Sequence, residues 1–350
     1  MKRTDSIAPP ATSFDLEDRR IRELVRGLHT AKPRVYWSDL LVTTALGWAA
    51  FALAVAQRPF SPGMWGAVAV AVLALYRALL FIHEISHQGA RSLPGFEATW
   101  NFLVGYPMLI PSCVYAGVHQ SHHGLGTYGT ALDPEYLPFA RSSRMTVVFA
   151  LESFLIPVVL VVRFLLLTPV GLVWPPFQKW LVVHLSSLTM NLEYRRDATP
   201  EIVRMVRRQT TGILFLWAAF FALWLDGILP FRVFGIWLLV SSLVSFINTL
   251  RTLGAHAYES SGAPLDRMGQ LVDSIDTPGA VWTELWAPVG LRYHALHHYF
   301  PGIPYHNLPE AWKKVSVSLP PEAFYHRVRS PGLARSLRSL YRKGQRRPNR

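Results

Sequence analysis

The chain has 350 residues, of which 51% are hydrophobic and only 16% are charged. A soluble domain carries about 25% charged residues, so this deficit argues against an ordinary soluble protein and favours one embedded in lipid. The net charge of +13 is concentrated before the first apolar run and at the end of the chain, which is typical of cytoplasmic flanks that face anionic headgroups. No nucleic-acid-binding module accompanies these basic residues, so we expect no nucleic acid partner.

The first 35 residues are polar and charged, unlike a signal peptide with its apolar core. We expect residues 1–35 to form a cytoplasmic arm that becomes helical around Leu16–Leu28. Cys113 is the only cysteine. One thiol can form no internal disulfide, which suits a reducing compartment, and it cannot hold an iron–sulfur cluster, which needs four thiolates.

Two apolar runs follow the arm, at Leu40–Ala56 and Met64–Ile82, with a short turn between them. Each approaches the roughly 20 residues that a helix needs to cross a bilayer, and the short turn makes them an antiparallel hairpin. A second pair of runs, Gly212–Trp224 and Val233–Ile247, is joined in the same way. The two hairpins predict four transmembrane helices with both termini in the cytoplasm. We expect an integral, multi-pass protein of a bacterial inner membrane.

Two other apolar segments are interrupted. Residues 98–118 are interrupted by Gly105, Pro107 and Pro111, which indicates an interfacial or re-entrant element rather than a clean span. Residues 145–174 contain a glutamate, an arginine and two prolines. For this second segment, a membrane span and an amphipathic helix lying in the interface are both open.

Eight of the thirteen histidines fall in three short boxes beside apolar segments: HEISH, HQSHH and HALHH. Imidazole is the commonest side-chain metal ligand, and eight imidazoles exceed the four ligands of one tetrahedral zinc. On a helix, residues three or four apart project from the same face. The boxes therefore predict two metal ions at a membrane surface, held by His83, His87, His119, His122, His123, His294, His297 and His298.

The three boxes, set between two apolar hairpins, resemble the histidine boxes of the membrane fatty acid desaturases and related hydroxylases. The segment 299–309, from Tyr-Phe-Pro to His-Asn-Leu-Pro, also resembles the stretch after their third box, so the resemblance covers about residues 40–312. We predict an all-α integral membrane protein with four transmembrane helices in two hairpins and a cytoplasmic helical cap that carries the boxes. A catalytic domain at 36–312 would precede a basic cytoplasmic tail at 313–350.

The resemblance implies that nine histidines bind two iron ions and that O2 is the co-substrate that attacks an unactivated C–H bond. His256 is the candidate for the ninth ligand. Some desaturases have an asparagine four residues before this histidine, whereas this chain has Thr252 there and Asn248 one turn further back. Ligand histidines usually donate their second ring N–H to an oxygen atom. The candidates for such supporting roles are Glu84, Asp133, Glu135, Asn248, Glu259 and His306.

The substrate implied by the resemblance is a fatty acid or acyl lipid from the surrounding membrane, and Arg251 or Arg292 could meet its headgroup. Desaturation is the simplest outcome. Hydroxylation of a lipid chain, or oxidative decarboxylation of a fatty acid to a terminal alkene, is possible on the same scaffold. The electrons would come from a separate protein, such as ferredoxin or cytochrome b5 with its reductase, because the chain contains no flavin, haem or iron–sulfur motif.

Two other classes of protein compete with this interpretation. HEISH is also an HExxH sequence, the signature of zinc metalloproteases in which the glutamate is the general base. That interpretation leaves six box histidines unexplained and puts Asp226, its possible third ligand, at the opposite membrane face. A metal transporter would need polar ligands within its spans, and these spans are nearly free of them.

Overall fold

The computed structural model describes residues 13–188 and 190–346. Their regular structure is helical, with only isolated bridges between extended residues. The helix expected in the N-terminal arm is α1, Ser13–Val25, followed by a short 3-10 turn at Arg26–Leu28. The first twelve residues of the arm and the last four of the basic tail lie outside the described residues.

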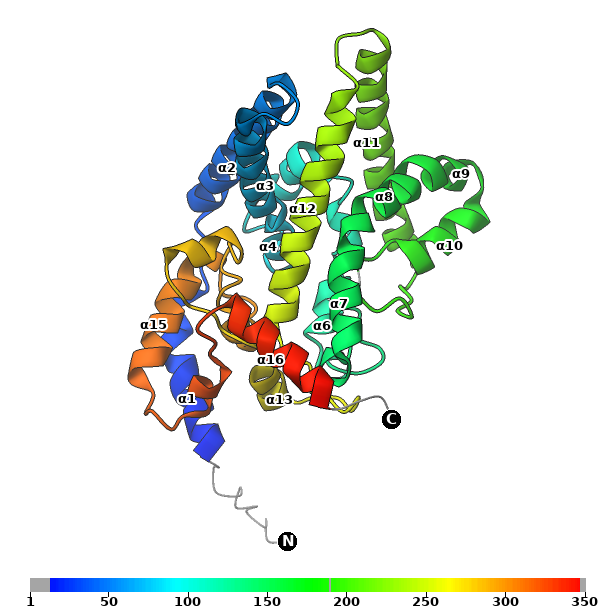
Figure 1. The fold of residues 1–350 in the computed structure, drawn as a ribbon. Coiled ribbons are helices and arrows are strands. Elements are labelled where there is room, and N and C mark those ends of the chain that lie inside the picture. Colours follow the sequence, from blue (N-terminus) through cyan, green and yellow to red (C-terminus); the bar gives the residue numbers. More distant parts are fainter. Residues whose placement is uncertain (1–12, 189, 347–350) are drawn as a thin grey trace.

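Five helical segments are long and apolar enough to cross a membrane: Pro33–Ala56, Pro62–His87, Ser143–Val173, Pro200–Leu225 and Arg232–Ala255. Four of them contain the four predicted runs, and the fifth is the segment that the sequence left between a span and an interfacial helix. In Figure 1, α2 (Pro33–Ala56) stands beside α3 (Pro62–Leu79), and α11 (Pro200–Leu225) stands beside α12 (Arg232–Ala255). The length and composition of these helices therefore indicate a membrane protein.

The burial of the five segments separates a central helix from peripheral ones. About two-thirds of the apolar window of Pro62–His87 is buried (67%), against 17% for Ser143–Val173. The peripheral helices leave large apolar side chains exposed, among them Val42, Leu151 and Phe215. Water would penalise such surfaces, whereas lipid tails solvate them without cost. The helix that leads into the HEISH box is thus the one that the protein itself surrounds.

The segment Ser143–Val173 is not a regular helix. It consists of α7 (Ser143–Glu152), α8 (Ile156–Val161) and α9 (Thr168–Val173), joined by a 3-10 turn and a π-helical stretch. Arg163 lies in the π-helical stretch and is buried, with its guanidinium donating to Leu185 O and to Thr168 Oγ1. A buried cation held by internal oxygen atoms lets the apolar side chains around it face lipid. The helix α10 (Pro175–Leu185) follows.

The interrupted region 98–118 forms no long helix. A short helix α5 (Phe96–Trp100) runs into a π-helical turn at Asn101–Gly105 and then a 3-10 turn at Ser112–Val114. Asn101 accepts a hydrogen bond from the backbone N–H of Ser112 (2.8 Å), which closes the loop upon itself. This region is not among the five membrane-crossing candidates. It leads directly to the HQSHH box.

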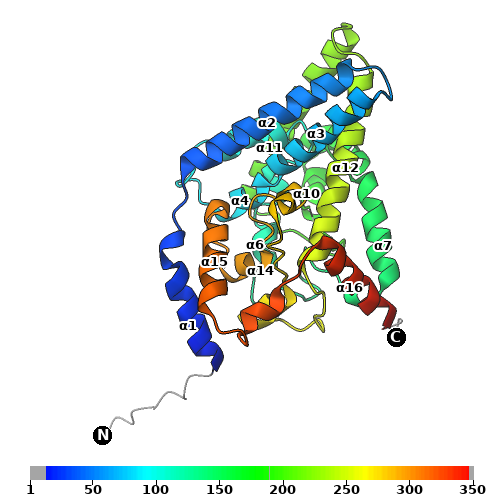
Figure 2. The ribbon, with the colours of Figure 1, turned by 60° about the vertical axis from the view of Figure 1, so that its left-hand side comes forward.

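The remaining helices gather at one end of the molecule. They are α4 (Phe81–His87), α6 (Val118–His122), α13 (Arg267–Asp273), α14 (His294–Tyr299), α15 (Leu308–Ser318) and α16 (Leu333–Arg346). In Figure 2, α4, α6 and α14 lie in the middle of the molecule, with α1 and α15 to one side and α16 to the other. The three short helices that carry the histidine boxes are therefore enclosed by longer ones.

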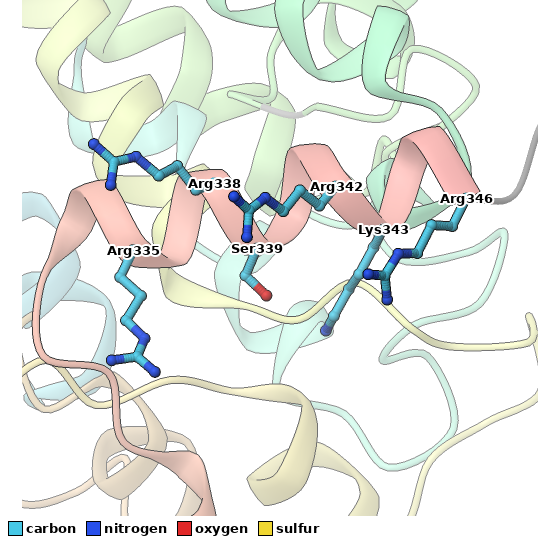
Figure 3. A pocket seen from close by; sticks show the side chains of 6 residues that line it. All are labelled: Arg335, Arg338, Ser339, Arg342, Lys343 and Arg346. Atoms are coloured by element: carbon cyan, nitrogen blue, oxygen red, sulfur yellow. The ribbon is translucent and has the colours of Figure 1, made fainter.

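The helix α16 crosses the end of α12 and the start of α7. Leu333 packs against Gly254, and Gly344 lies against the backbone of Ser143 so closely that a Cβ at residue 344 would meet it at 2.4 Å. The opposite side of α16 carries five basic residues around an open groove of about 620 Å³: Arg335, Arg338, Arg342, Lys343 and Arg346 (Figure 3). No box histidine lines this groove, so it is separate from the candidate metal centre.

Candidate metal centre

The nine histidines named from the sequence come together in two groups. The five-histidine group contains His83, His87, His119, His123 and His297, and the four-histidine group contains His122, His256, His294 and His298. Within each group, one nitrogen atom of every imidazole lies within 4.8 Å of the corresponding atoms of the others. Each group could hold one metal ion.

Each histidine box lies on its own short helix and contributes ligand candidates to one or both groups. The box on α4 serves the five-histidine group alone, whereas the boxes on α6 and α14 serve both groups. His122 points to one group and its neighbour His123 to the other, because adjacent residues on a helix diverge by about 100°. His256 joins the four-histidine group from the C-cap of α12. The HxxHH spacing thus brings the two groups next to each other.

Two local features fix the helices that carry the boxes. Gly117 begins α6 with a φ of +78°, a conformation that glycine adopts at little cost, and its N–H donates to Gln120 Oε1 (2.7 Å). The N-terminus of α14 is capped from a distance: Asp276 Oδ1 accepts from the N–H groups of Ala295 (2.8 Å) and Leu296 (3.2 Å). Both helices are short, so these contacts determine where the histidines point.

The distances between ring nitrogens fit metal ligation. The Nε2 atoms of His256 and His294 are 2.8 Å apart, and those of His119 and His123 are 3.0 Å apart. Two imidazoles that each bind one ion at about 2.0–2.1 Å have their nitrogens roughly 3 Å apart at a right angle. In addition, Nε2 of His83 and of His87 is buried without a hydrogen-bond partner among the described residues. Buried polar atoms are normally paired, and a metal ion in the five-histidine group would pair both of these.

Three histidines are supported from behind by protein oxygen atoms. Nδ1 of His122 donates to Asp133 Oδ1 (2.9 Å), and Nδ1 of His119 lies 3.0 Å from Glu135 Oε1. Such contacts fix the tautomer, because the ring then presents Nε2 to the metal. Asp133 also accepts from the N–H groups of Gly129 and Glu135, so its own position is fixed.

The third supported histidine uses residues that sequence reasoning missed. Nδ1 of His256 is 2.8 Å from the hydroxyl of Tyr128, which in turn donates to Asp273 Oδ2 (3.0 Å). Tyr115 plays a similar part beside His119, at 2.8 Å from its Nδ1. Tyr115 precedes His119 by one helical turn, which is a signal that the sequence contained. Asp273 is 17 residues after His256 and carries no comparable signal.

Four other expected supporting residues are placed away from the histidines' hydrogen bonds. Glu84 Oε1 is 3.7 Å from His83 Nδ1, and its other oxygen accepts from the hydroxyl of Tyr36 and the N–H of Tyr305. Asn248, on α12, accepts through Oδ1 from Arg251 Nη2 (3.0 Å). The carboxylate of Glu259 turns outward to Lys343 (3.3 Å).

His306 is the fourth of these residues. Its Nε2 accepts from the backbone N–H of Lys32 (3.0 Å), and its Nδ1 lies 2.8 Å from Asn307 Oδ1. Asn307 itself donates to Leu28 O (2.9 Å). His306 therefore ties the start of α2 to the segment after the third box, and its role in this structure is to join two parts of the chain.

Burial shifts the pKa values of the groups outside the spans. It lowers the pKa of His119, His123, His256, His294, His297 and His298 well below the usual value, so these imidazoles are neutral and able to bind a metal. His122 is the exception: burial lowers its pKa, but the Asp133 carboxylate more than offsets this and raises it. Burial also raises the pKa of Glu135 to about 7 and that of Asp273 to about 6.

The comparisons with known proteins agree with this geometry. The profile of the family "Fatty acid desaturase" matches residues 59–330. The chain belongs to this family. It is also 37% identical over 328 residues to a ceramide hydroxylase of Caulobacter vibrioides (strain NA1000 / CB15N), a match that covers 93% of each protein. No solved structure gives a significant match.

Membership of the family makes this protein a membrane oxidoreductase that oxidises fatty-acyl chains. It also removes the zinc protease alternative. In the structure, Glu84 of HEISH is held by Tyr36 and Tyr305 rather than facing open space beside the histidines. Asp226, the possible third zinc ligand, is the C-cap of α11. The turn between α11 and α12 lies at the top of Figure 1, far from α6 and α13.

Proposed function

We propose that this protein hydroxylates a ceramide, or a closely similar lipid with an amide link, by means of O2 and two iron ions. The observation that carries the proposal is the 37% identity to a ceramide hydroxylase along almost the whole length of both proteins. Similarity to this hydroxylase favours hydroxylation over desaturation, although desaturation was the simplest outcome expected from the sequence alone. The two histidine groups support a two-metal centre in either case.

The nine histidines would hold the irons, with His122, His123, His256 and the rest of the two groups as ligands through one ring nitrogen each. Iron bound there would supply the activation of O2 and the attack on a C–H bond. One oxygen atom of O2 would enter the C–H bond as a hydroxyl group. The other would leave as water, which requires two protons and two electrons from outside.

The protein's own residues would fix the orientation of the ligand imidazoles. Asp133 and Glu135 hold two of the imidazoles from behind, and Tyr128 holds a third. The electrons would come from a separate redox protein such as ferredoxin or cytochrome b5. We place the histidine groups and both termini on the cytoplasmic side, where the basic flanks of the chain are expected.

The test is expression in a host that makes unhydroxylated ceramide, followed by mass spectrometry of the total lipids. Hydroxylation adds 16 mass units to ceramide, desaturation removes two, and decarboxylation of a fatty acid gives a volatile alkene. We expect the gain of 16 units, together with close to two iron ions per purified chain. A loss of two units without a gain of 16 would replace the proposed hydroxylation with desaturation.

The matched controls are single alanine variants of histidines inside and outside the groups. His297→Ala removes a ligand of the five-histidine group and should abolish the product. His184→Ala removes a histidine of α10 whose Nδ1 lies 3.0 Å from the Trp180 carbonyl oxygen and which belongs to neither group. It should leave the product unchanged. Equal activity of the two variants would contradict the proposed metal centre.

A further inference from the structure

A small cavity adjoins both histidine groups. Its volume is about 20 Å³, which is room for about one water molecule. Five of its lining residues are box or ninth histidines, and the others come from four parts of the chain: Tyr115, Glu135, Met190, Arg251, Thr252 and Ala255. The cavity touches histidines of both groups, so its lining bears on which chemical group of a lipid can lie beside the metal centre.

Arg251 is the one permanently charged cation in this lining. It is on α12, five residues before His256. A guanidinium remains protonated and offers only donors, so Arg251 cannot be a metal ligand. Its position beside the metal centre needs another explanation.

The hydrogen bonds of Arg251 leave part of the guanidinium unused. Nη2 donates to Asn248 Oδ1 (3.0 Å) and to Thr252 Oγ1 (2.8 Å). Nε is buried and has no hydrogen-bond partner among the described residues. Within the same part of the chain, no carboxylate forms an ion pair with Arg251 at 4.0 Å or less. Arg251 also interacts with the Tyr76 hydroxyl and with the charge of Glu135 in the same lining. The donor that remains without a hydrogen bond beside the cavity is therefore Nε alone.

The cost of leaving such a donor unpaired decides what the cavity accepts. A buried polar group without a hydrogen bond loses several kcal/mol relative to water, and a charged one loses more. The middle of an acyl chain consists of methylene groups, which could not pair with Arg251 and would displace any water that does. A carbonyl or hydroxyl oxygen would pair with it. The cavity therefore favours the part of a lipid that carries oxygen atoms.

We propose that Arg251 binds an oxygen atom of the lipid substrate beside the histidine groups and so directs oxidation to a carbon within a few bonds of that oxygen. The inference rests on the proposed function and adds the position of attack. In a ceramide, the oxygen atoms are confined to the amide and to the first carbons of the sphingoid base. The hydroxylated carbon is accordingly close to the amide, and the far ends of both chains are left unmodified.

The first test is the position of the new hydroxyl group in the wild-type product, determined by tandem mass spectrometry. A hydroxyl within the first few carbons of either chain is the expected result. A hydroxyl in the distal half of a chain would overturn the role of Arg251 while leaving the proposed hydroxylation intact. Absence of any hydroxylated ceramide would instead count against the proposed function, so the two failures are distinguishable.

The second test measures lipid binding and does not depend on turnover. Radiolabelled C16 ceramide is bound to purified, metal-free protein in detergent, with octadecane as a probe that has no oxygen. Arg251→Met keeps an unbranched apolar stem and removes the guanidinium with its charge. It should weaken ceramide binding about 10- to 100-fold, the range for losing a hydrogen bond to a charged group, and leave octadecane binding unchanged. Arg251→Lys keeps the charge, and its affinity for ceramide should lie between those of the wild type and of Arg251→Met.

Two controls separate this role from a structural one. Arg207→Met changes an exposed arginine of α11 and should bind ceramide like the wild type. The iron content of the reloaded Arg251→Met protein should remain close to that of the wild type, because Arg251 does not contact either group through an observed hydrogen bond. Unchanged ceramide affinity and an unchanged hydroxyl position in Arg251→Met would refute the inference.

Discussion

The two histidine groups differ in how firmly the protein holds them. All four members of the four-histidine group are buried, and Nδ1 of two of them meets an oxygen atom that leads to a carboxylate, Asp133 or Asp273. In the five-histidine group, His87 and His123 are partly exposed, and His119 alone has such support among the described residues. The protein therefore preorganises one metal site more than the other, although both are built from the same boxes.

Removing one ligand from each group should have the largest effect. His256→Ala and His87→Ala should each abolish the oxidised lipid, because the proposed chemistry needs both irons. The iron content should fall from about two to about one per chain in both variants. Metal analysis together with lipid mass spectrometry checks this. A variant that keeps two irons and forms product would show that its histidine is not a ligand.

Removing the carboxylates behind the ligands should have the second-largest effect. Because Asp133 supports one group and Glu135 the other, the two variants compare the groups directly. Asp133→Asn weakens the one hydrogen bond that supports His122 from behind among the described residues. Residues in such positions typically affect metal affinity or activity about 10- to 100-fold. Glu135→Gln should cost less, because His119 keeps its 2.8 Å contact with Tyr115. Competition with a chelator during metal loading measures both affinities. Equal losses in the two variants would mean that the groups are held alike.

The ligands of the site could be predicted from the sequence, whereas most of the residues that support them could not. Ligand spacing in HEISH, HQSHH and HALHH, helped by the resemblance to a family, was enough to name all nine histidines that the structure brings together. A box is local, so its pattern is visible in a few residues. The supports of the ligands are not local. The carboxylate of Asp273 reaches His256 through the hydroxyl of Tyr128, which is 145 residues from Asp273 in the chain. Their identity depends on tertiary packing that no local pattern records.

The same reasoning applies to the fold. The length of the apolar runs and the short turns between them predicted helices at the four hairpin segments, and the structure has long apolar helices there. Glu259 and His306 were named because they lie near boxes in the sequence, but their side chains turn to Lys343 and to the Lys32 backbone. A residue close to a histidine in the chain has its backbone near that histidine. The direction of its side chain, however, depends on what packs around it.

Asp276 supports both groups at once, because it caps α14 and thereby holds His294, His297 and His298. Burial raises its pKa from 3.8 to about 6. A carboxyl group with a raised folded pKa stabilises the fold below its unfolded pKa, and this contribution is lost as the pH rises through the folded value. The wild type should therefore lose up to about 3 kcal/mol relative to Asp276→Asn between pH 4 and pH 7.

Thermal unfolding of metal-free protein in detergent at several pH values checks this prediction. Asparagine can still accept from the two α14 N–H groups, so the variant should bind two irons at pH 7. The difference in melting temperature between the two proteins is the quantity to follow. A difference that does not depend on pH between 4 and 7 would mean that Asp276 is not buried as an acid. A variant that loses its iron would show that the charge, rather than the hydrogen bonds, holds α14.

The smallest expected effect is a difference between the two groups in the rate at which they release bound metal. Water and a chelator reach a metal ion through exposed ligands, and only the five-histidine group has partly exposed members, His87 and His123. Loss of iron to a chelator should have two phases, and the faster one, by several-fold, belongs to this group. The single-ligand variants assign the phases: His256→Ala should retain the fast phase and His87→Ala the slow one. If His87→Ala retained the fast phase instead, exposure of the ligands would not control metal release, and the four-histidine group would be the less firmly held of the two.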